Sequence, residues 1–203
     1  MVIVHGPGAM DLLKPEVYAA RNEGKANGSL YFTMEYLHGA DLGQVFDAAR
    51  ARGGDLAIGH AITIIMGVCY GLHFAHEMCR VDGRPMSIVH RDVSPHNVIV
   101  GLDGRARITD FGIARATGRA GATRDEQTKG KLAYMAPEQA RGKTVDRRAD
   151  VWAFGVVLCE MLTARRLFEA ETVSDTLAAV LRADIDLAAL PAGTPSAVRR
   201  LIA

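Results

Sequence analysis

The chain has 203 residues, of which 49% are hydrophobic and 23% are charged, and its formal net charge is +1. This length suits one domain, or one domain with a fragment of another, and it is ample for a hydrophobic core. The near-neutral charge argues against a nucleic-acid-binding surface, and the three cysteines have neither disulfide-framework nor metal-binding spacing, which fits a reducing cytoplasm.

The first third of the chain begins with a turn-rich stretch and then becomes regular. Residues 1–28 show no secretory signal pattern. Asn27-Gly28 precedes the run SLYFTMEYL, which predicts a strand, the second arm of a hairpin. Helices are expected over 41–52 and 59–79. In the second helix, apolar residues recur at steps of three and four and predict one buried stripe, made of Ile62, Ile65, Cys69, Leu72 and Ala75.

The middle of the chain alternates between short apolar runs and polar loops. Two apolar runs, 87–89 and 98–100, flank the loop HRDVSPHN and have the character of short strands. Asp103-Gly104 predicts a hairpin between NVIVGL and RARIT. The polar stretch 113–133 has no periodicity and predicts a mobile surface loop, and long loops in compact domains are usually functional.

The last third of the chain predicts helices. From Asp150 the sequence is apolar nearly all round, which predicts a helix at the centre of its domain. Further helices are expected over 172–182 and from Pro195 onward. The longest apolar run, 151–159, is too short to cross a membrane. A little β structure followed by mostly helix predicts an α+β fold with a dominant helical lobe.

Three polar side chains are expected to converge at one edge of the predicted hairpin. Asp92 and Asn97 share the loop 90–97, and Asp110 ends the hairpin, in TDFG. Because a hairpin brings its two ends to the same edge, two carboxylates and a carboxamide should lie close together. Oxygen ligands without histidine or thiolate suit Mg²⁺ with substrate phosphates. The alternative, that these residues only form turns, stays open at this point.

Three motifs occur in the order and spacing of one family. They are H-R-D-x-x-x-x-N at 90–97, D-F-G at 110–112 and A-P-E at 136–138. Over about residues 29–203 the chain therefore resembles the bacterial, eukaryotic-like Ser/Thr protein kinases. The resemblance implies a protein kinase-like α+β fold, with residues 1–37 as an N-lobe remnant and hinge and residues 38–203 as the helical C-lobe.

The resemblance implies a catalytic role for each residue of these motifs. Asp92 would orient the acceptor hydroxyl or accept its proton, and Asn97 and Asp110 would hold the Mg²⁺ ions that bridge the phosphates of ATP. Phe111 would pack beneath the site. Asp150 would brace the catalytic loop through its backbone, and a simple N-cap role at the start of its helix is compatible with that.

The resemblance also places the nucleotide. MEYL would be the hinge, with Met34 as gatekeeper and the backbone of Glu35 and Leu37 bound to adenine. Ile99 would form the floor of the adenine pocket. Asp41 is equally suited to reach the ribose or to cap the following helix.

Regulation by phosphorylation follows from a basic residue beside the catalytic aspartate. By resemblance, Arg91 would pair with a phosphate in the polar loop and order that loop. Thr117, Thr123 and Thr128 are the candidates, with Thr123 and Thr128 nearest the usual position. Each of them could instead be an ordinary solvated threonine.

Two positions depart from the family pattern together. Ser94 stands where Ser/Thr kinases usually carry a lysine that contacts the transferring phosphate, and Lys131 stands where they usually carry a threonine. We expect Lys131 to supply the missing cation from the other side, with Ser94 making room. The alternative is that Lys131 is a solvated loop lysine.

Parts of the family pattern are missing from the sequence. HGPGAM lacks the third glycine of a Gly-rich loop, and neither Lys14 nor Lys25 sits in a V-A-I-K-like strand. We expect most of the N-lobe to be absent, and the arginine partner of Glu138 to lie beyond Ala203.

The expected function is that of a cytoplasmic protein Ser/Thr kinase catalytic region that transfers the γ-phosphate of ATP and depends on the missing N-lobe. Its expected partners are ATP, a protein substrate and a second kinase copy for autophosphorylation, without nucleic acid or a membrane segment. One alternative is a non-catalytic, pseudokinase interaction module. Another is a small-molecule phosphotransferase of kinase-like fold, which the A-P-E motif and the threonine-bearing loop disfavour.

Overall fold

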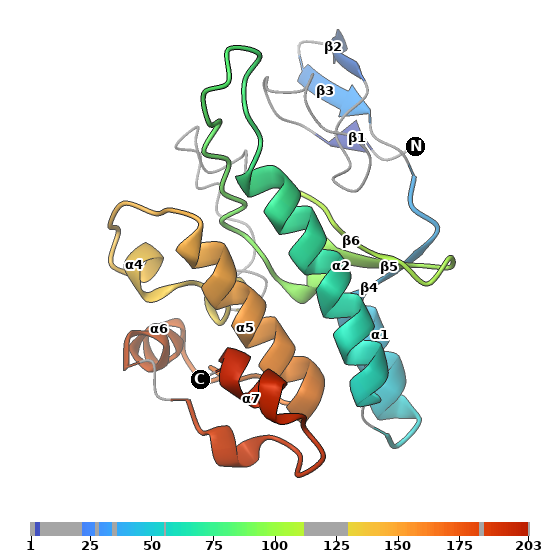
Figure 1. The fold of residues 1–203 in the computed structure, drawn as a ribbon, viewed down its shortest axis with the longest axis vertical. Coiled ribbons are helices and arrows are strands. Elements are labelled where there is room, and N and C mark those ends of the chain that lie inside the picture. Colours follow the sequence, from blue (N-terminus) through green and yellow to red (C-terminus); the bar gives the residue numbers. More distant parts are fainter. Residues whose placement is uncertain are drawn as a thin grey trace.

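The computed structural model describes residues 3–4, 22–26, 29–33, 36–54, 56–111, 130–182 and 185–202. Its strands are β1 (Ile3–Val4), β2 (Asn22–Ala26), β3 (Ser29–Thr33), β4 (Gly39–Asp41), β5 (Val98–Gly101) and β6 (Ala106–Ile108). Its helices are α1 (Leu42–Ala51), α2 (Ile58–His76), α4 (Pro137–Ala140), α5 (Arg148–Thr163), α6 (Val173–Arg182) and α7 (Ser196–Ile202), with short 3₁₀ turns at Pro95–Asn97 and Leu187–Ala189. Figure 1 shows the first three strands at one end of the molecule and the helices at the other.

Both predicted hairpins are confirmed. Strands β2 and β3 pair antiparallel on either side of Asn27-Gly28, with Ala26 opposite Ser29, and β1 extends this sheet along β3. Strands β5 and β6 pair antiparallel around Asp103-Gly104, and β4 joins them along β5. Gly104 has a φ of 77°, the left-handed conformation that a tight turn requires and that glycine adopts without strain. The turn at Gly104 therefore fits the register of the β5–β6 hairpin.

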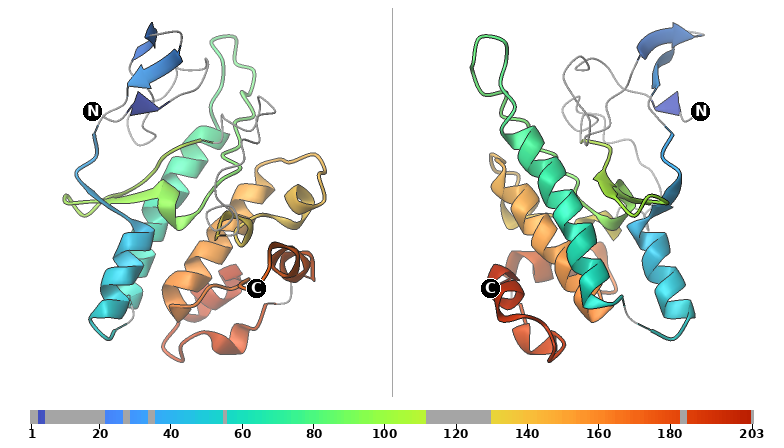
Figure 2. Two further views of the ribbon diagram at one scale, coloured as in Figure 1. Left: turned by 180° about the vertical axis from the view of Figure 1, so that it is seen from behind. Right: turned by 45° about the vertical axis from the view of Figure 1, so that its right-hand side comes forward.

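The helical lobe is built around α2 and α5, which lie side by side (Figure 2). The prediction of a central helix near Asp150 is confirmed, although α5 begins two residues earlier, at Arg148. Ten of its residues are buried, namely Ala149, Asp150, Ala153, Val156, Val157, Leu158, Cys159, Glu160, Met161 and Leu162. The β5–β6 hairpin packs on the other side of α2 through β6.

Two details of the prediction for α2 are wrong. The helix ends at His76 rather than at residue 79. The chain then turns back, and the backbone of Cys79 forms an isolated antiparallel β-bridge with that of Pro85. The buried face is also rotated from the predicted stripe, so that Cys69 is exposed and Ile62 is only half-buried. Since α2 contacts both α5 and β6, its buried residues cover a wider face: Ala61, Ile64, Ile65, Val68, Gly71, Leu72 and Ala75.

The prediction of a strand-like run at 87–89 is also wrong. These residues form no strand, and Ser87 has a φ of 50°, which an extended strand does not allow. The remaining helices agree with the sequence: α1 and α6 each begin one residue inside the expected range, and α7 follows Pro195.

By length and composition alone, α2 is apolar enough to cross a membrane, and it is the one such helix among the described residues. In this fold its apolar side chains form part of the core with α5 and β6.

Candidate active site

The backbone of the loop 90–97 is held by a buried carboxylate from α5. Asp150 Oδ2 accepts the backbone N–H of His90 at 2.8 Å, and Asp150 Oδ1 accepts that of Arg91 at 2.8 Å. His76, in the last turn of α2, lies with its Nε2 2.8 Å from Asp150 Oδ2. Asp150 therefore braces the loop as expected. It is not the N-cap of α5, which is Arg147.

His90 is fully buried and joins the loop to the end of β6. Its Nε2 lies 2.9 Å from the carbonyl oxygen of Thr109, and its Nδ1 lies 3.3 Å from the backbone nitrogen of Asp92. An N–H at Nε2 and a lone pair at Nδ1 satisfy both contacts, which assigns the neutral ring. Burial lowers the pKa of His90, in agreement with that assignment. The ring packs against Phe111 at a centroid distance of 4.4 Å.

Asp92 and Asn97 are in direct contact. The side-chain N–H₂ of Asn97 donates to the carbonyl oxygen of Asp92 at 2.6 Å and to Asp92 Oδ2 at 3.1 Å. The backbone N–H of Thr109 donates to the carbonyl oxygen of Asn97 at 2.8 Å, which brings Asp110 beside the loop. Asp110 is exposed and has a φ of 58°. The loop 90–97 and the end of the β5–β6 hairpin therefore lie next to each other.

Lys131 reaches the same carboxylate from another segment. It lies in a helical turn just after the undescribed residues 112–129, and its Nζ is 2.6 Å from Asp92 Oδ2. Ser94 is 1% exposed, and its Oγ has no hydrogen-bond partner among the described residues. Gln139 donates to the carbonyl oxygen of Arg91 at 3.0 Å and so ties the A-P-E segment to the loop.

The donor set suits a divalent cation bound together with phosphates. Both hydrogens of the Asn97 amide are used within the loop, and no described residue donates to its Oδ1. That oxygen and the exposed carboxylate of Asp110 are hard ligands of the kind Mg²⁺ uses with substrate phosphates. No group of three or more His, Cys, Asp or Glu side chains in the described ranges could hold a metal by itself.

The predicted nucleotide contacts are described only in part. Met34 and Glu35 lie outside the described residues, whereas Leu37 is half-buried and precedes β4. Ile99 lies in β5, half-buried and opposite Asp41 of β4. Asp41 is the N-cap of α1: its Oδ1 accepts the backbone N–H of Gln44 at 2.9 Å.

The predicted regulatory residues are also described in part. Arg91 is exposed and has a φ of 66°, and no hydrogen bond or ion pair of its side chain occurs among the described residues. Thr117, Thr123 and Thr128 lie outside the described residues. Lys25 does lie in a strand, β2, although its sequence NEGKA lacks the V-A-I-K pattern.

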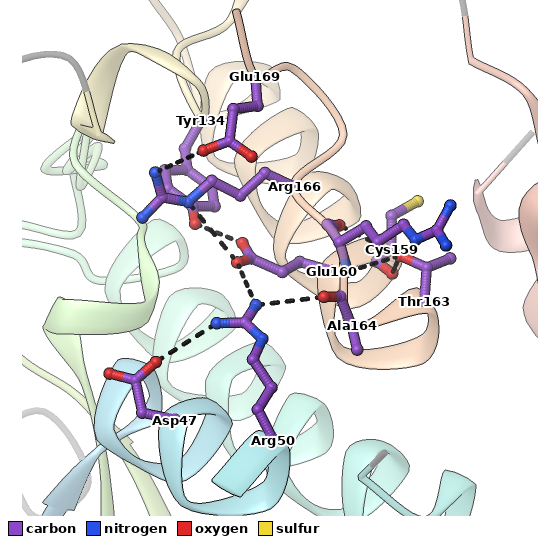
Figure 3. A network of polar contacts seen from close by, with 10 residues as sticks. Asp47, Arg50, Tyr134, Cys159, Glu160, Thr163, Ala164, Arg166 and Glu169 are labelled. Atoms are coloured by element: carbon purple, nitrogen blue, oxygen red, sulfur yellow. Dashed lines mark hydrogen bonds and ion pairs between the residues drawn. The ribbon is translucent and has the colours of Figure 1, made fainter. Parts of the chain in front are cut away.

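A buried polar network around Glu160 was not predicted (Figure 3). Glu160 of α5 is 3% exposed and accepts the hydroxyl of Tyr134, three residues after Lys131. Guanidinium groups flank it from two elements, with Arg50 of α1 at 3.8 Å and Arg166, beyond α5, at 3.9 Å. Burial raises the pKa of Glu160, and burial together with the Glu160 charge raises that of Tyr134.

Sequence comparisons agree with this geometry. A protein kinase domain model matches residues 13–197. The chain is 41% identical over 177 residues to the tyrosine-protein kinase MasK of Myxococcus xanthus, which is 87% of this chain and 27% of MasK. It is 32% identical over 191 residues to the serine/threonine-protein kinase PrkC of Bacillus subtilis, 94% of this chain and 26% of PrkC.

A third relative is the serine/threonine-protein kinase PknB of Mycolicibacterium smegmatis, 37% identical over 166 residues, 79% of this chain and 25% of PknB. The chain thus spans about a quarter of the length of these curated relatives. With the family match over most of its length and the expected helical lobe around its three motifs, the chain belongs to the protein kinase family.

Proposed function

We propose that this chain is the catalytic region of a bacterial protein kinase that transfers the γ-phosphate of ATP to a serine or threonine hydroxyl of a protein. One observation carries the proposal. Asp92 Oδ2 is held by both Asn97 and Lys131, whereas no described residue donates to Asp92 Oδ1. One oxygen of the carboxylate is thereby fixed, and the other is left to meet an acceptor hydroxyl.

In the proposed reaction, the acceptor oxygen forms a bond to the γ-phosphorus while the bond from that phosphorus to the bridging oxygen breaks. ADP leaves with the electron pair of the broken bond. The proton of the hydroxyl moves to Asp92 Oδ1. Catalysis of this step is mostly positioning and electrostatic stabilisation, so the rigid bracing of the loop by Asp150 supports the proposal.

Asn97 Oδ1 and the Asp110 carboxylate would hold Mg²⁺. When bound, this ion neutralises the phosphate charge that develops during transfer. The adenine would lie between the hinge, at Met34 to Leu37, and Ile99 of β5.

The proposal extends to the rest of the domain. We place the N-lobe remnant and hinge at residues 1–37 and the C-lobe at 38–203, with an N-lobe required for full activity. The proposed site of action is the cytoplasm, where ATP is available. The three cysteines are free thiols, in keeping with a reducing compartment.

Tyrosine is the second candidate acceptor. MasK is named a tyrosine-protein kinase, whereas PrkC and PknB are named serine/threonine-protein kinases. Ser94, in place of the usual lysine, also departs from the Ser/Thr pattern. Analysis of the phosphorylated amino acids in the products separates the two candidates.

The first experiment is calorimetric titration of the purified chain with ATP in the presence of Mg²⁺. We expect binding that Asp110→Ala abolishes and that Asp82→Ala, at an exposed loop carboxylate, leaves unchanged. Transfer of γ-phosphate label to a protein acceptor should then be lost in Asp92→Asn. Binding and transfer that survive both site variants would refute the proposed site. Binding without any transfer by the wild type would favour the non-catalytic interaction module.

A further inference from the structure

The positive charge nearest Asp92 is carried by a different segment from the loop that carries Asp92. Lys131 Nζ lies 2.6 Å from Asp92 Oδ2, and the lysine side chain is 41% exposed. It can therefore reach both the carboxylate and a phosphate bound in front of it. The loop 90–97 itself supplies no lysine, and the side chain of its arginine, Arg91, makes no hydrogen bond or ion pair with Asp92 in the described part of the chain.

Within the loop, Ser94 stands where Ser/Thr kinases usually carry a lysine, and its hydroxyl makes no hydrogen bond with a described residue. Its Oγ is buried and has no partner in the part of the chain that the structure describes. An unpaired buried hydroxyl is unfavourable, so hydrogen bonding does not account for a serine here. A small side chain at this place is compatible with a lysine that enters from the neighbouring segment.

The position of Lys131 is set by the Glu160 network. The backbone N–H of Tyr134 donates to the carbonyl oxygen of Lys131 at 3.2 Å, which closes the helical turn, and the Tyr134 hydroxyl donates to Glu160. Glu160 belongs to α5, the helix that also supplies Asp150 to the catalytic loop. The helix α5 thus supports the loop that carries Asp92 through Asp150, and the turn that carries Lys131 through Glu160.

We propose that Lys131 is the phosphate-facing cation of the transfer reaction, supplied to the site from outside the catalytic loop. The proposal rests on the proposed function. Lys131 stays protonated throughout and stabilises the negative charge of the transferring phosphoryl group.

The test compares kcat and KM for ATP in four forms of the chain. Lys131→Ala should lower kcat by about 100-fold or more, since one preorganised donor is typically worth 10²–10³ in rate, with little change in KM. Lys131→Arg keeps the charge and should retain activity within about tenfold. Lys143→Ala, at an exposed lysine, is the matched control and should equal the wild type.

A double variant tests whether the positive charge itself, rather than its place in the sequence, supports transfer. Ser94→Lys with Lys131→Ala moves the charge into the catalytic loop, and it should recover at least tenfold over Lys131→Ala.

Three results would each contradict a stated part of the proposal. A Lys131→Ala variant within threefold of Lys143→Ala would overturn the catalytic assignment. A folded double variant that recovers no activity over Lys131→Ala would overturn the assignment of the effect to the positive charge. Failure of every form, the wild type included, both to bind Mg²⁺-ATP and to transfer phosphate would overturn the proposed function, whereas wild-type transfer with an unchanged Lys131→Ala variant would overturn this inference alone.

Discussion

Asp150 accepts the backbone N–H of Arg91 at 2.8 Å, although the two residues are 59 positions apart. Arg91 has a φ of 66°, a left-handed conformation that costs a non-glycine residue about 1–2 kcal/mol. Asp150 also accepts the N–H of His90. The carboxylate therefore holds the loop in a strained geometry that local sequence alone would not keep, and this geometry orients Asp92.

Removal of this carboxylate should destabilise the protein. Asp150→Ala leaves the buried N–H of His90 and the partly buried N–H of Arg91 without an acceptor and His76 without its partner. Because an unsatisfied buried donor costs about 1–3 kcal/mol, we expect the free energy of unfolding to fall by about 3 kcal/mol. Urea denaturation measures the change. Asp82→Ala, at an exposed carboxylate, should stay within about 0.5 kcal/mol, and an equally small effect of Asp150→Ala would contradict the bracing role.

Arg91→Ala should separate folding from regulation. The Arg91 side chain is exposed and the substitution keeps the same backbone conformation, so we expect a change in unfolding free energy of no more than about 0.5 kcal/mol. The response of activity to phosphorylation at Thr123 and Thr128 should be lost, since no guanidinium remains to pair with the phosphate. Activity is compared before and after phosphatase treatment. A preserved response would show that another group binds the phosphate.

His90 should make stability depend on pH. Burial holds its pKa below the ordinary value of 6.5, so the unfolded chain binds a proton more readily than the native state. The contribution of the neutral His90 ring to the free energy of unfolding is therefore present above pH 6.5. It is lost as the pH falls from 6.5 toward the pKa of His90 in the folded state. We expect the stability advantage of the wild type over His90→Phe to shrink between pH 7.5 and 5.5 in urea unfolding. Parallel pH curves for the two proteins would rule out the buried neutral ring.

Much of the fold follows from local sequence signals. Asn27-Gly28 and Asp103-Gly104 each predicted a hairpin, because these dipeptides adopt the backbone conformations that tight turns require. The nearly all-apolar sequence after Asp150 predicted the central helix. In contrast, residues 87–89 pair with no strand in the described part of the chain, and the sequence pattern alone could not reveal that. The face that α2 buries likewise depends on its two neighbours, α5 and β6.

The candidate site shows the same division. Asp92, Asn97 and Asp110 were predicted to converge from motif spacing, and Lys131 was expected near Ser94 by resemblance to the family. The contacts of Gln139 with Arg91, of His76 with Asp150 and of Arg50 with Glu160 have no local signal in the sequence, because each joins segments brought together only by the fold.

Glu160 should make the free energy of unfolding depend on pH in the opposite direction to His90. Burial raises its pKa above the ordinary value of 4.5, so the native state holds a proton more readily than the unfolded chain. Stability from this group is fully present below pH 4.5 and is lost as the pH rises through the folded pKa. Glu160→Gln keeps an acceptor for Tyr134 and cannot ionise, so the wild type should become less stable relative to this variant as the pH rises from 4.5 to 8. A constant difference across this range would refute the prediction. Arg50 and Arg166 are 45% and 40% exposed, so solvent screens their opposing effect.

The contact between α2 and β6 should make one glycine irreplaceable. A Cβ on Gly67, inside α2, would lie 2.6 Å from the carbonyl oxygen of Ala106 in β6, closer than real contacts allow. Alanine favours a helix over glycine by about 1 kcal/mol, but the clash is with backbone and should cost about 1–3 kcal/mol. We therefore expect Gly67→Ala to lower or at best maintain the melting temperature. Gly155, inside α5, has nothing within 4 Å of a built Cβ, so Gly155→Ala should raise the melting temperature. Calorimetric unfolding of both variants checks this, and a clear rise for Gly67→Ala would show that α2 and β6 lie farther apart than described.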